Sequence, residues 1–330
     1  MSGPVRLIGI EEHFLTDEVL SAWEAIGLSA KDPSAAFHSG ETGRRLMNLA
    51  DERLALMDET GVDVQVLSLT TPALHDLGVE GVDIARRAND AIAELIARRP
   101  GRFQGLATLP VAMPDDAATE LKRCISELGF GGAMLCGRVG ERNLDHPDLF
   151  PILQAADRLG APLLLHPRTP PEAVRSAYYS GLGYEVDAAL ATFGMGWHYD
   201  AGMQFVRLVA SGTLDLLPNL QLILGHWGEV VLFYSERLSA LDRVANLDLP
   251  FADYLRRNLH ITASGMFSRD YLQRAASIVG TDRLLFSTDY PYQYRPGRDA
   301  RRFIDDCGLT GEDLAAFAHG NWERLTARST

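Results

Sequence analysis

Eight short apolar segments recur along the chain, and this pattern constrains the fold more than any other feature. Each segment is bounded by turn residues, as expected for parallel strands that are buried on both faces. The predicted strands are Val5–Ile10, Val64–Leu69, Phe103–Leu109, Gly132–Leu135, Pro162–Leu165, Leu220–Leu224, Leu259–Ala263 and Arg283–Phe286.

Amphipathic helices are predicted between these strands. In the clearest, Ile84, Ala88 and Ile92 share one face, while Arg86 and Asp90 lie on the opposite one. Eight strands that alternate with helices predict right-handed βα units closed into a (β/α)8 TIM barrel of the α/β class. An open doubly wound sheet is the alternative, but no glycine-rich phosphate loop follows the first strand.

The chain is expected to form a single domain, residues 1–330, because no stretch rich in proline, glycine or serine divides it. Two connections, residues 14–47 and 167–198, are longer than ordinary loops. Long segments within a compact domain are usually lids or binding loops. We expect both insertions, after strands 1 and 5, to cover the mouth of the active site.

Composition excludes several classes of protein. A net charge of −13 argues against a partner that is a nucleic acid or an anionic membrane, since both require a basic face. No apolar run approaches the roughly 18 residues of a membrane helix, and no secretory signal opens the chain. The three cysteines, Cys124, Cys136 and Cys307, are far apart and fit a reducing compartment. We therefore expect a soluble cytoplasmic protein.

Polar residues that directly follow predicted strands are the strongest functional signal. Glu11 and His13 follow the first strand, His166 the fifth and Asp289 the eighth. The carboxyl ends of barrel strands form the catalytic face, so these residues should converge there. Two imidazoles and two carboxylates suit one Zn²⁺ or Mn²⁺ ion with an open position for water or substrate. Any one of the four alone would be better explained as a loop cap; together they predict a metal site.

His226 and Glu229 form a second candidate pair after the sixth strand. Glu229 can reach back to one ring nitrogen and direct the other toward the pocket. His226 would then act as a base, a substrate hydrogen-bond partner or a fifth metal ligand. The alternatives are a structural histidine at a helix entry and a first-turn carboxylate favoured by the helix dipole.

Other polar and aromatic residues carry a weaker signal. The aromatic residues flanking the site fit either a flat aromatic ligand or core packing; they are Trp197, Trp227, Tyr290 and Tyr292. The remaining histidines are interpreted mostly as surface or packing residues: His38, His75, His146, His198, His260 and His319. Because the chain has only two lysines, arginine is expected to bind any anion; the nearby candidates are Arg44, Arg45, Arg53, Arg168 and Arg237.

Five separated motifs resemble the metal-dependent decarboxylases of the amidohydrolase superfamily. This branch includes aminocarboxymuconate semialdehyde, γ-resorcylate, dihydroxybenzoate and 5-carboxyvanillate decarboxylases. The motifs are Glu11-Glu12-His13-Phe14, Leu165-His166-Pro167, Leu224-Gly225-His226-Trp227-Gly228-Glu229, Ile261-Thr262-Ala263-Ser264-Gly265 and Ser287-Thr288-Asp289-Tyr290-Pro291. The resemblance covers nearly the whole chain, although the strand-4 end at 135–138 and the insertion at 14–47 depart from the family pattern.

The resemblance implies roles for individual residues. The implied metal ligands are Glu11, His13, His166 and Asp289; the implied catalytic residues are Asp289, His226 and Glu229; and the implied substrate contacts are Arg45, Arg237, Tyr292 and Ser264. Arg45 would hold the substrate carboxylate, and Arg237 would buttress the histidine–glutamate pair. The resemblance also implies a homodimer or homotetramer.

The implied activity is non-oxidative decarboxylation of a hydroxylated aromatic carboxylic acid, a small-molecule substrate. Asp289 would protonate the ring carbon that bears the carboxylate, and loss of CO2 would restore aromaticity. A metal-dependent hydrolase of a lactone or amide, with metal-bound water as nucleophile, is the alternative on the same barrel. A catalytically idle metal-binding barrel is a third possibility, but it would have no need of the His226–Glu229 pair.

Overall fold

A computed structural model of the chain, which describes residues 4–327, contains one sheet of eight parallel strands in sequential order. The terminal residues of the predicted domain, 1–3 and 328–330, lie outside the described residues. The strands are β1 (Ile8–Phe14), β2 (Val64–Leu69), β3 (Phe103–Ala107), β4 (Gly132–Cys136), β5 (Leu163–His166), β6 (Leu222–Leu224), β7 (Leu259–Thr262) and β8 (Leu284–Leu285).

The sheet closes on itself where the first strand meets the segment that follows the last. The amide of Ile10 donates to the carbonyl of Phe286 at 3.0 Å, and that of His13 donates to the carbonyl of Tyr290 at 2.7 Å. The predicted closed barrel is therefore confirmed, and the open doubly wound sheet is excluded.

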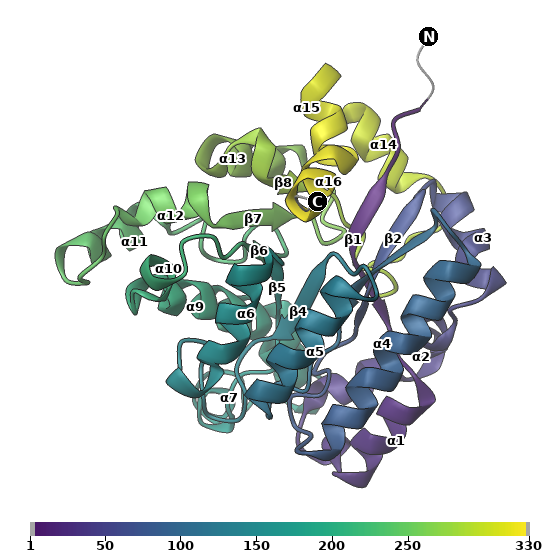
Figure 1. Cartoon of the computed structure of the whole chain (residues 1–330), viewed down its shortest axis with the longest axis horizontal. Coiled ribbons are helices and arrows are strands. Elements are labelled where there is room, and N and C mark those ends of the chain that lie inside the picture. The colour runs from purple at the N-terminus through teal and green to yellow at the C-terminus, as the bar shows by residue number, and fades with distance from the viewer. Residues whose placement is uncertain (1–3, 328–330) are drawn as a thin grey trace.

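Helices surround the strands (Figure 1). They are α1 (Asp17–Ala25), α2 (Gly40–Met47), α3 (Asp51–Thr60), α4 (Glu80–Arg98), α5 (Pro114–Ser126), α6 (Phe150–Leu159), α7 (Glu172–Tyr178), α8 (Tyr184–Ala189), α9 (Gly196–Ala210), α10 (Thr213–Leu216), α11 (Ser235–Leu238), α12 (Phe251–Arg257), α13 (Arg269–Val279), α14 (Asp299–Asp306), α15 (Gly311–Ala315) and α16 (Asn321–Thr326). Among these described helices none is long and apolar enough to cross a membrane.

The predicted strands coincide with the observed ones except at their ends. The largest difference is in the first, where the strand begins at Ile8 and extends through Glu11, Glu12 and His13 to Phe14. All seven residues of β1 are buried. The polar residues remain in the strand because other buried groups bind their side chains, so an apolar run alone underestimates its length.

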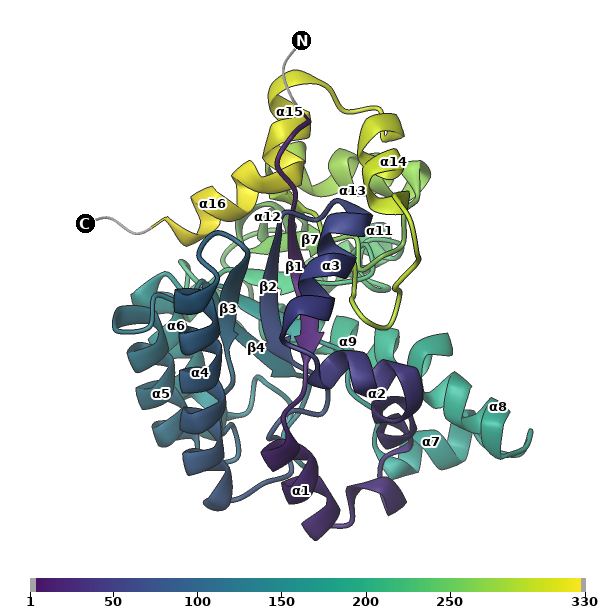
Figure 2. The same cartoon turned by 90° about the vertical axis from the view of Figure 1, so that its right-hand side faces the viewer.

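Both insertions are folded and lie at the same end of the barrel. Figure 2 shows α1 and α2 of the first and α7 and α8 of the second beyond the arrowhead of β1. Phe37 of the first insertion packs edge-on against Phe193 and Trp197 of the second, with ring centroids 5.6 and 5.8 Å apart. Thr169 also donates to Asp32 at 2.6 Å. The insertions thus contact each other over the carboxyl ends of the strands.

Arg53 of α3 links β1 to the first insertion from a fully buried position. Its guanidinium donates to the carbonyls of His13 at 2.7 Å, Arg45 at 3.1 Å and Asn48 at 2.8 Å. The cation also lies 4.6 Å from the ring centroid of Tyr290, which belongs to the segment after β8. Burial lowers the pKa of Arg53 to about 10, a value that still leaves it charged at neutral pH.

We expect Arg53→Met to destabilise the protein by about 3 kcal/mol, because three backbone carbonyls would lose their donor. The control is Arg99→Met, which removes a solvent-exposed ion pair to Asp51 and should change stability little. Thermal unfolding followed by circular dichroism should show a lower midpoint for Arg53→Met than for Arg99→Met. Equal midpoints would contradict the structural role of Arg53.

Candidate functional site

Two acidic and two imidazole side chains meet at the carboxyl ends of the strands. Glu11 and His13 lie in β1, His166 ends β5, and Asp289 follows β8. One ligand atom from each of the four lies within 4.8 Å of the others, and all four residues are buried. The convergence predicted from strand ends is therefore present in the structure.

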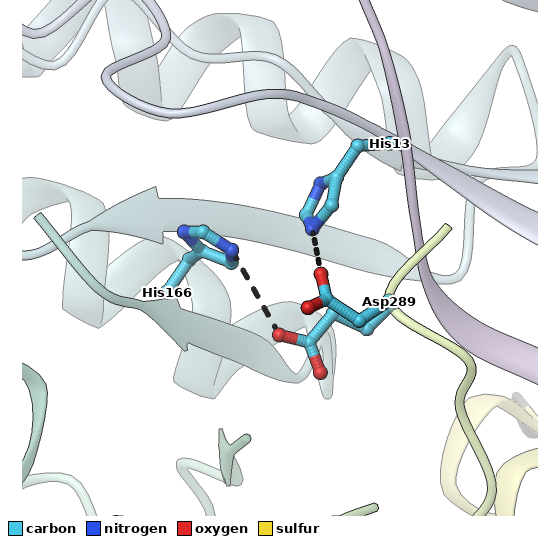
Figure 3. Close-up of side chains that lie close together, drawn as sticks. His13, His166 and Asp289 are labelled. Atoms are coloured by element: carbon cyan, nitrogen blue, oxygen red, sulfur yellow. Dashed lines mark ion pairs between the residues drawn. The ribbon is translucent and has the colours of Figure 1, made fainter. Parts of the chain in front are cut away.

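The side chains of His13, His166 and Asp289 point toward one another (Figure 3). His13 Nε2 lies 3.4 Å from Asp289 Oδ1, and His166 Nε2 lies 3.8 Å from Glu11 Oε1. Although buried, Glu11 Oε1 and His13 Nε2 have no hydrogen-bond partner among residues 4–327. Buried polar atoms without partners are uncommon and indicate a missing ion or water. The donor set and these free atoms together fit one divalent metal ion.

Hydrogen bonds on the far side of each ring fix the histidine orientation. His13 Nδ1 lies 3.1 Å from the hydroxyl of Ser68, and His166 Nδ1 lies 3.0 Å from the carbonyl of Pro167. Such partners hold the other nitrogen toward a metal. Burial lowers the pKa of His13 to about 4 and that of His166 to about 3. Both rings are thus neutral at pH 7, as metal ligation requires.

Glu11 is held by three hydroxyl groups. Thr262 donates to Glu11 Oε2 at 2.8 Å, and Ser264 and, at 3.5 Å, Ser287 donate to the same oxygen. Gly225 allows this approach, since a Cβ there would lie 2.7 Å from the Ser264 hydroxyl and 3.0 Å from Glu11 Oε1. Oε2 is therefore bound by the protein, while Oε1 remains available.

Glu12 positions the loop that carries Asp289, a role that the sequence analysis did not identify. Its carboxylate accepts the amide of Thr288 at 2.8 Å and that of Tyr290 at 3.3 Å. Asp289 lies between these residues with φ 55°, a conformation that a side chain makes costly. Burial, and then the charge of Glu11, raises the pKa of Asp289 well above its ordinary value.

His226 and Glu229 form the predicted pair, with Glu229 Oε1 2.9 Å from His226 Nδ1. Burial alone would lower the pKa of His226, but the charge of Glu229 raises it to about 10. A third member was not identified from the sequence: His198 Nδ1 lies 2.6 Å from Glu229 Oε2. His198 belongs to α9 at the end of the second insertion, and no periodic pattern placed that segment beside β6.

A cavity of about 430 Å³ opens beside both groups. It is lined by Phe37, Thr42, His166, Phe193, Trp197, His198, His226, Met266, Asp289, Tyr292 and Gln293. Three of the aromatic residues come from the insertions and one from the segment after β8. The wall is thus mostly apolar, with histidines and a carboxylate converging at one end, as in small-molecule sites generally.

The four predicted substrate contacts occupy different places. Tyr292 lines the cavity, and its hydroxyl contacts Thr70. Ser264 is fully buried, and its hydroxyl is engaged by Glu11 and by the amide of His226 at 2.7 Å. Because these contacts occupy its hydroxyl, the structure places Ser264 behind the site and away from the cavity wall.

The two arginines also lie outside the cavity wall. Arg45 in α2 pairs with Glu41 at 3.1 Å, and its guanidinium lies 4.1 Å from the ring centroid of Tyr294. Arg237 lies in α11 with its side chain exposed. Among the described residues that line the cavity, none is an arginine or a lysine.

Comparison with known proteins gives a consistent set of relatives. γ-Resorcylate decarboxylase from Rhizobium radiobacter is 37% identical and covers 87% of this chain and 88% of its own length. A solved structure, 5-carboxyvanillate decarboxylase from Novosphingobium aromaticivorans complexed with manganese and 4-hydroxy-3-methoxy-5-nitrobenzoic acid, superposes with a TM-score of 0.88 at 28% identity. That similarity covers 98% of this chain and 96% of the other.

A second solved structure agrees. Dihydroxybenzoic acid decarboxylase from Polaromonas sp. JS666, with bound manganese and the inhibitor 2-nitroresorcinol, has a TM-score of 0.84 at 31% identity, covering 98% of this chain and 97% of that one. The amidohydrolase family model matches residues 13–325, nearly the whole chain. This chain therefore belongs to the amidohydrolase family, in line with its barrel fold and the polar residues at its strand ends.

Proposed function

We propose that this protein is a carboxy-lyase that removes CO2 without oxidation from a hydroxylated aromatic carboxylic acid. The observation that carries this proposal is the buried group of Glu11, His13, His166 and Asp289 beside a cavity with aromatic walls. The decarboxylase relatives support the same substrate class. The lactone or amide hydrolase has no comparable support.

The proposed cofactor is one divalent ion, with manganese favoured over zinc because two similar structures contain manganese. Glu11, His13, His166 and Asp289 would hold it. When bound, such an ion supplies a positive charge that favours a phenolate and a carboxylate of the substrate and stabilises charge on the phenolate oxygen.

Asp289 is proposed as the proton donor to carbon. Asp289 and His226 both line the cavity, so the Asp289 carboxyl group can reach a ring bound there. The proton forms a C–H bond at the ring carbon that bears the carboxylate. The bond from that carbon to CO2 then breaks, and its electron pair restores the aromatic ring. One proton is consumed for each CO2 released, and water returns it to Asp289.

His226, oriented by Glu229, is proposed to hydrogen-bond the substrate and to move the proton. The aromatic side chains Phe37, Trp197 and Tyr292 are proposed to stack against the ring and exclude water. Arg45 would have to leave Glu41 to reach a substrate carboxylate. In place of the substrate contact implied for Ser264, we propose that this residue positions Glu11.

We also propose a cytoplasmic, homo-oligomeric protein. Within the described residues, all three cysteines are free and buried, which supports a reducing compartment. Large apolar side chains are exposed near the site, including Phe233 at 77% and Met195 at 43%. Such residues are common where copies of a chain associate.

The reaction class is testable by incubating manganese-loaded protein with a panel of hydroxybenzoates and carboxylated vanillates. We expect loss of CO2, seen by mass spectrometry as a product lighter by one carboxyl group. A lactone and an amide panel runs in parallel. Gain of water by those compounds, with no decarboxylation, would reverse the assignment in favour of a hydrolase.

Replacing Asp289 with Asn should lower kcat for decarboxylation by about 10²–10⁴-fold, because the variant lacks the transferable proton. Metal content is measured on the same preparations, so loss of the proton donor is separated from loss of the metal. Turnover near the wild-type rate with metal bound would refute the role of Asp289.

Ser264→Ala should weaken manganese binding by about 10–100-fold, since Glu11 loses a hydrogen bond that orients it. Equilibrium dialysis against manganese measures this without any substrate. Ser277→Ala, on the exposed side of α13, is the control and should bind as wild type does. Unchanged affinity in Ser264→Ala would contradict the proposed arrangement.

A further inference from the structure

His198 connects the second insertion to the catalytic pair through two hydrogen bonds. Its Nδ1 lies 2.6 Å from Glu229 Oε2, and its Nε2 lies 3.0 Å from the carbonyl oxygen of Phe193. Its ring stands edge-on to that of His226, with centroids 4.8 Å apart. His198 and His226 therefore bind the two oxygens of a single carboxylate from different elements.

The two partners of His198, the Glu229 carboxylate and the Phe193 carbonyl, are both hydrogen-bond acceptors. A backbone carbonyl and an ionised carboxylate can accept hydrogen bonds but cannot donate them. Each ring nitrogen of His198 thus faces an acceptor, and the contact to Glu229 requires an N–H at Nδ1. Burial raises the pKa of Glu229, but the charge of His226 and the hydrogen bonds from both histidines outweigh it and lower that pKa. Each Glu229 oxygen is then engaged by one ring N–H.

The backbone around Glu229 needs such support. His226, Trp227 and Glu229 have φ values of 49°, 57° and 55°, in the left-handed region that side chains disfavour. Strained positions of this kind persist only where surrounding contacts hold them. The Glu229 side chain is fully buried, so its two histidine contacts fix the direction in which it presents His226.

We propose that His198 is a positioning residue for the reaction: it holds Glu229 so that Glu229 can orient His226, and it makes this orientation depend on the second insertion. This inference rests on the proposed function for its kinetic test. His198 also lines the cavity, but its ring nitrogens face Glu229 and Phe193.

Two substitutions separate positioning from a simple structural role. Asparagine places an amide nitrogen near the position of Nδ1, so His198→Asn retains a donor to Glu229 and loses the one to Phe193. Glutamine places its amide nitrogen near Nε2, so His198→Gln retains the donor to Phe193 and loses the one to Glu229. The two variants thus each remove one contact of the same histidine.

We expect His198→Gln to lower kcat by about 10–100-fold, with KM changed far less, and His198→Asn to retain most of the wild-type kcat. A residue that merely anchors the insertion would give the opposite order, because the contact to Phe193 would then matter more. That order, or wild-type kcat in both variants, would overturn the proposal. Metal content and the thermal midpoint are measured for each variant.

A second measurement does not depend on turnover or on the folding of a variant. In wild-type protein labelled with ¹⁵N-histidine, the shifts of His198 should show a proton on Nδ1, the nitrogen that faces Glu229. An Nδ1 without a proton would overturn the proposal even if decarboxylation is observed. Conversely, an absence of decarboxylase activity on every substrate, together with a protonated Nδ1, would refute the proposed function and leave the contact itself established.

Discussion

The burial of two carboxylates side by side is the constraint on which the site depends. Glu11 and Asp289 are at most 6% exposed, and each lies beside an imidazole that burial keeps neutral. Removing such charges from water is costly unless a positive partner is present. His226, with its pKa raised to about 10, supplies part of that charge, while the neutral His13 and His166 can bind a cation. The arrangement is therefore suited to a divalent ion.

The barrel makes this arrangement possible because it fixes the ends of distant strands. Glu11 and His13 are two residues apart in one strand, while His166 and Asp289 come from strands five and eight. Hydrogen bonds behind these residues then set their directions: Ser264 donates to Glu11, and the loop that carries Asp289 donates to Glu12. The site is thus rigid where the proposed metal binds.

Much of this could be predicted from the sequence, and the reason lies in periodicity. The buried strands are apolar runs, and a polar residue at the end of such a run is conspicuous, as at His166. Position in the barrel then places it at the catalytic face. By contrast, His198 lies in α9, where the second insertion ends, and the role of Glu12 depends on the backbone amides that it binds in the loop after β8. Neither contact follows from the spacing of residues along the chain.

Arg237 and Ser264 show the converse case: both are substrate contacts predicted from sequence, and neither lines the cavity. Each belongs to a segment near the site, yet one is exposed on α11 and the other is buried behind Glu11. Residues near a site in sequence differ in where their side chains point, and turns with positive φ change that direction abruptly. Motifs located the segments correctly, whereas the role of each residue required the backbone.

The site therefore has two parts of different origin. The proposed metal ligands lie on or directly after barrel strands, whereas Phe37, Trp197 and His198 reach the cavity from the insertions. A ring bound between them would contact both parts at once. The insertions supply most of the aromatic wall, and the strands supply the proposed metal ligands. Substituents on the substrate ring would therefore be contacted mainly by residues of the insertions. The contact between Glu229 and His198 joins the two parts, so that the position of the insertion and the orientation of the proposed proton-transfer group are linked through one carboxylate.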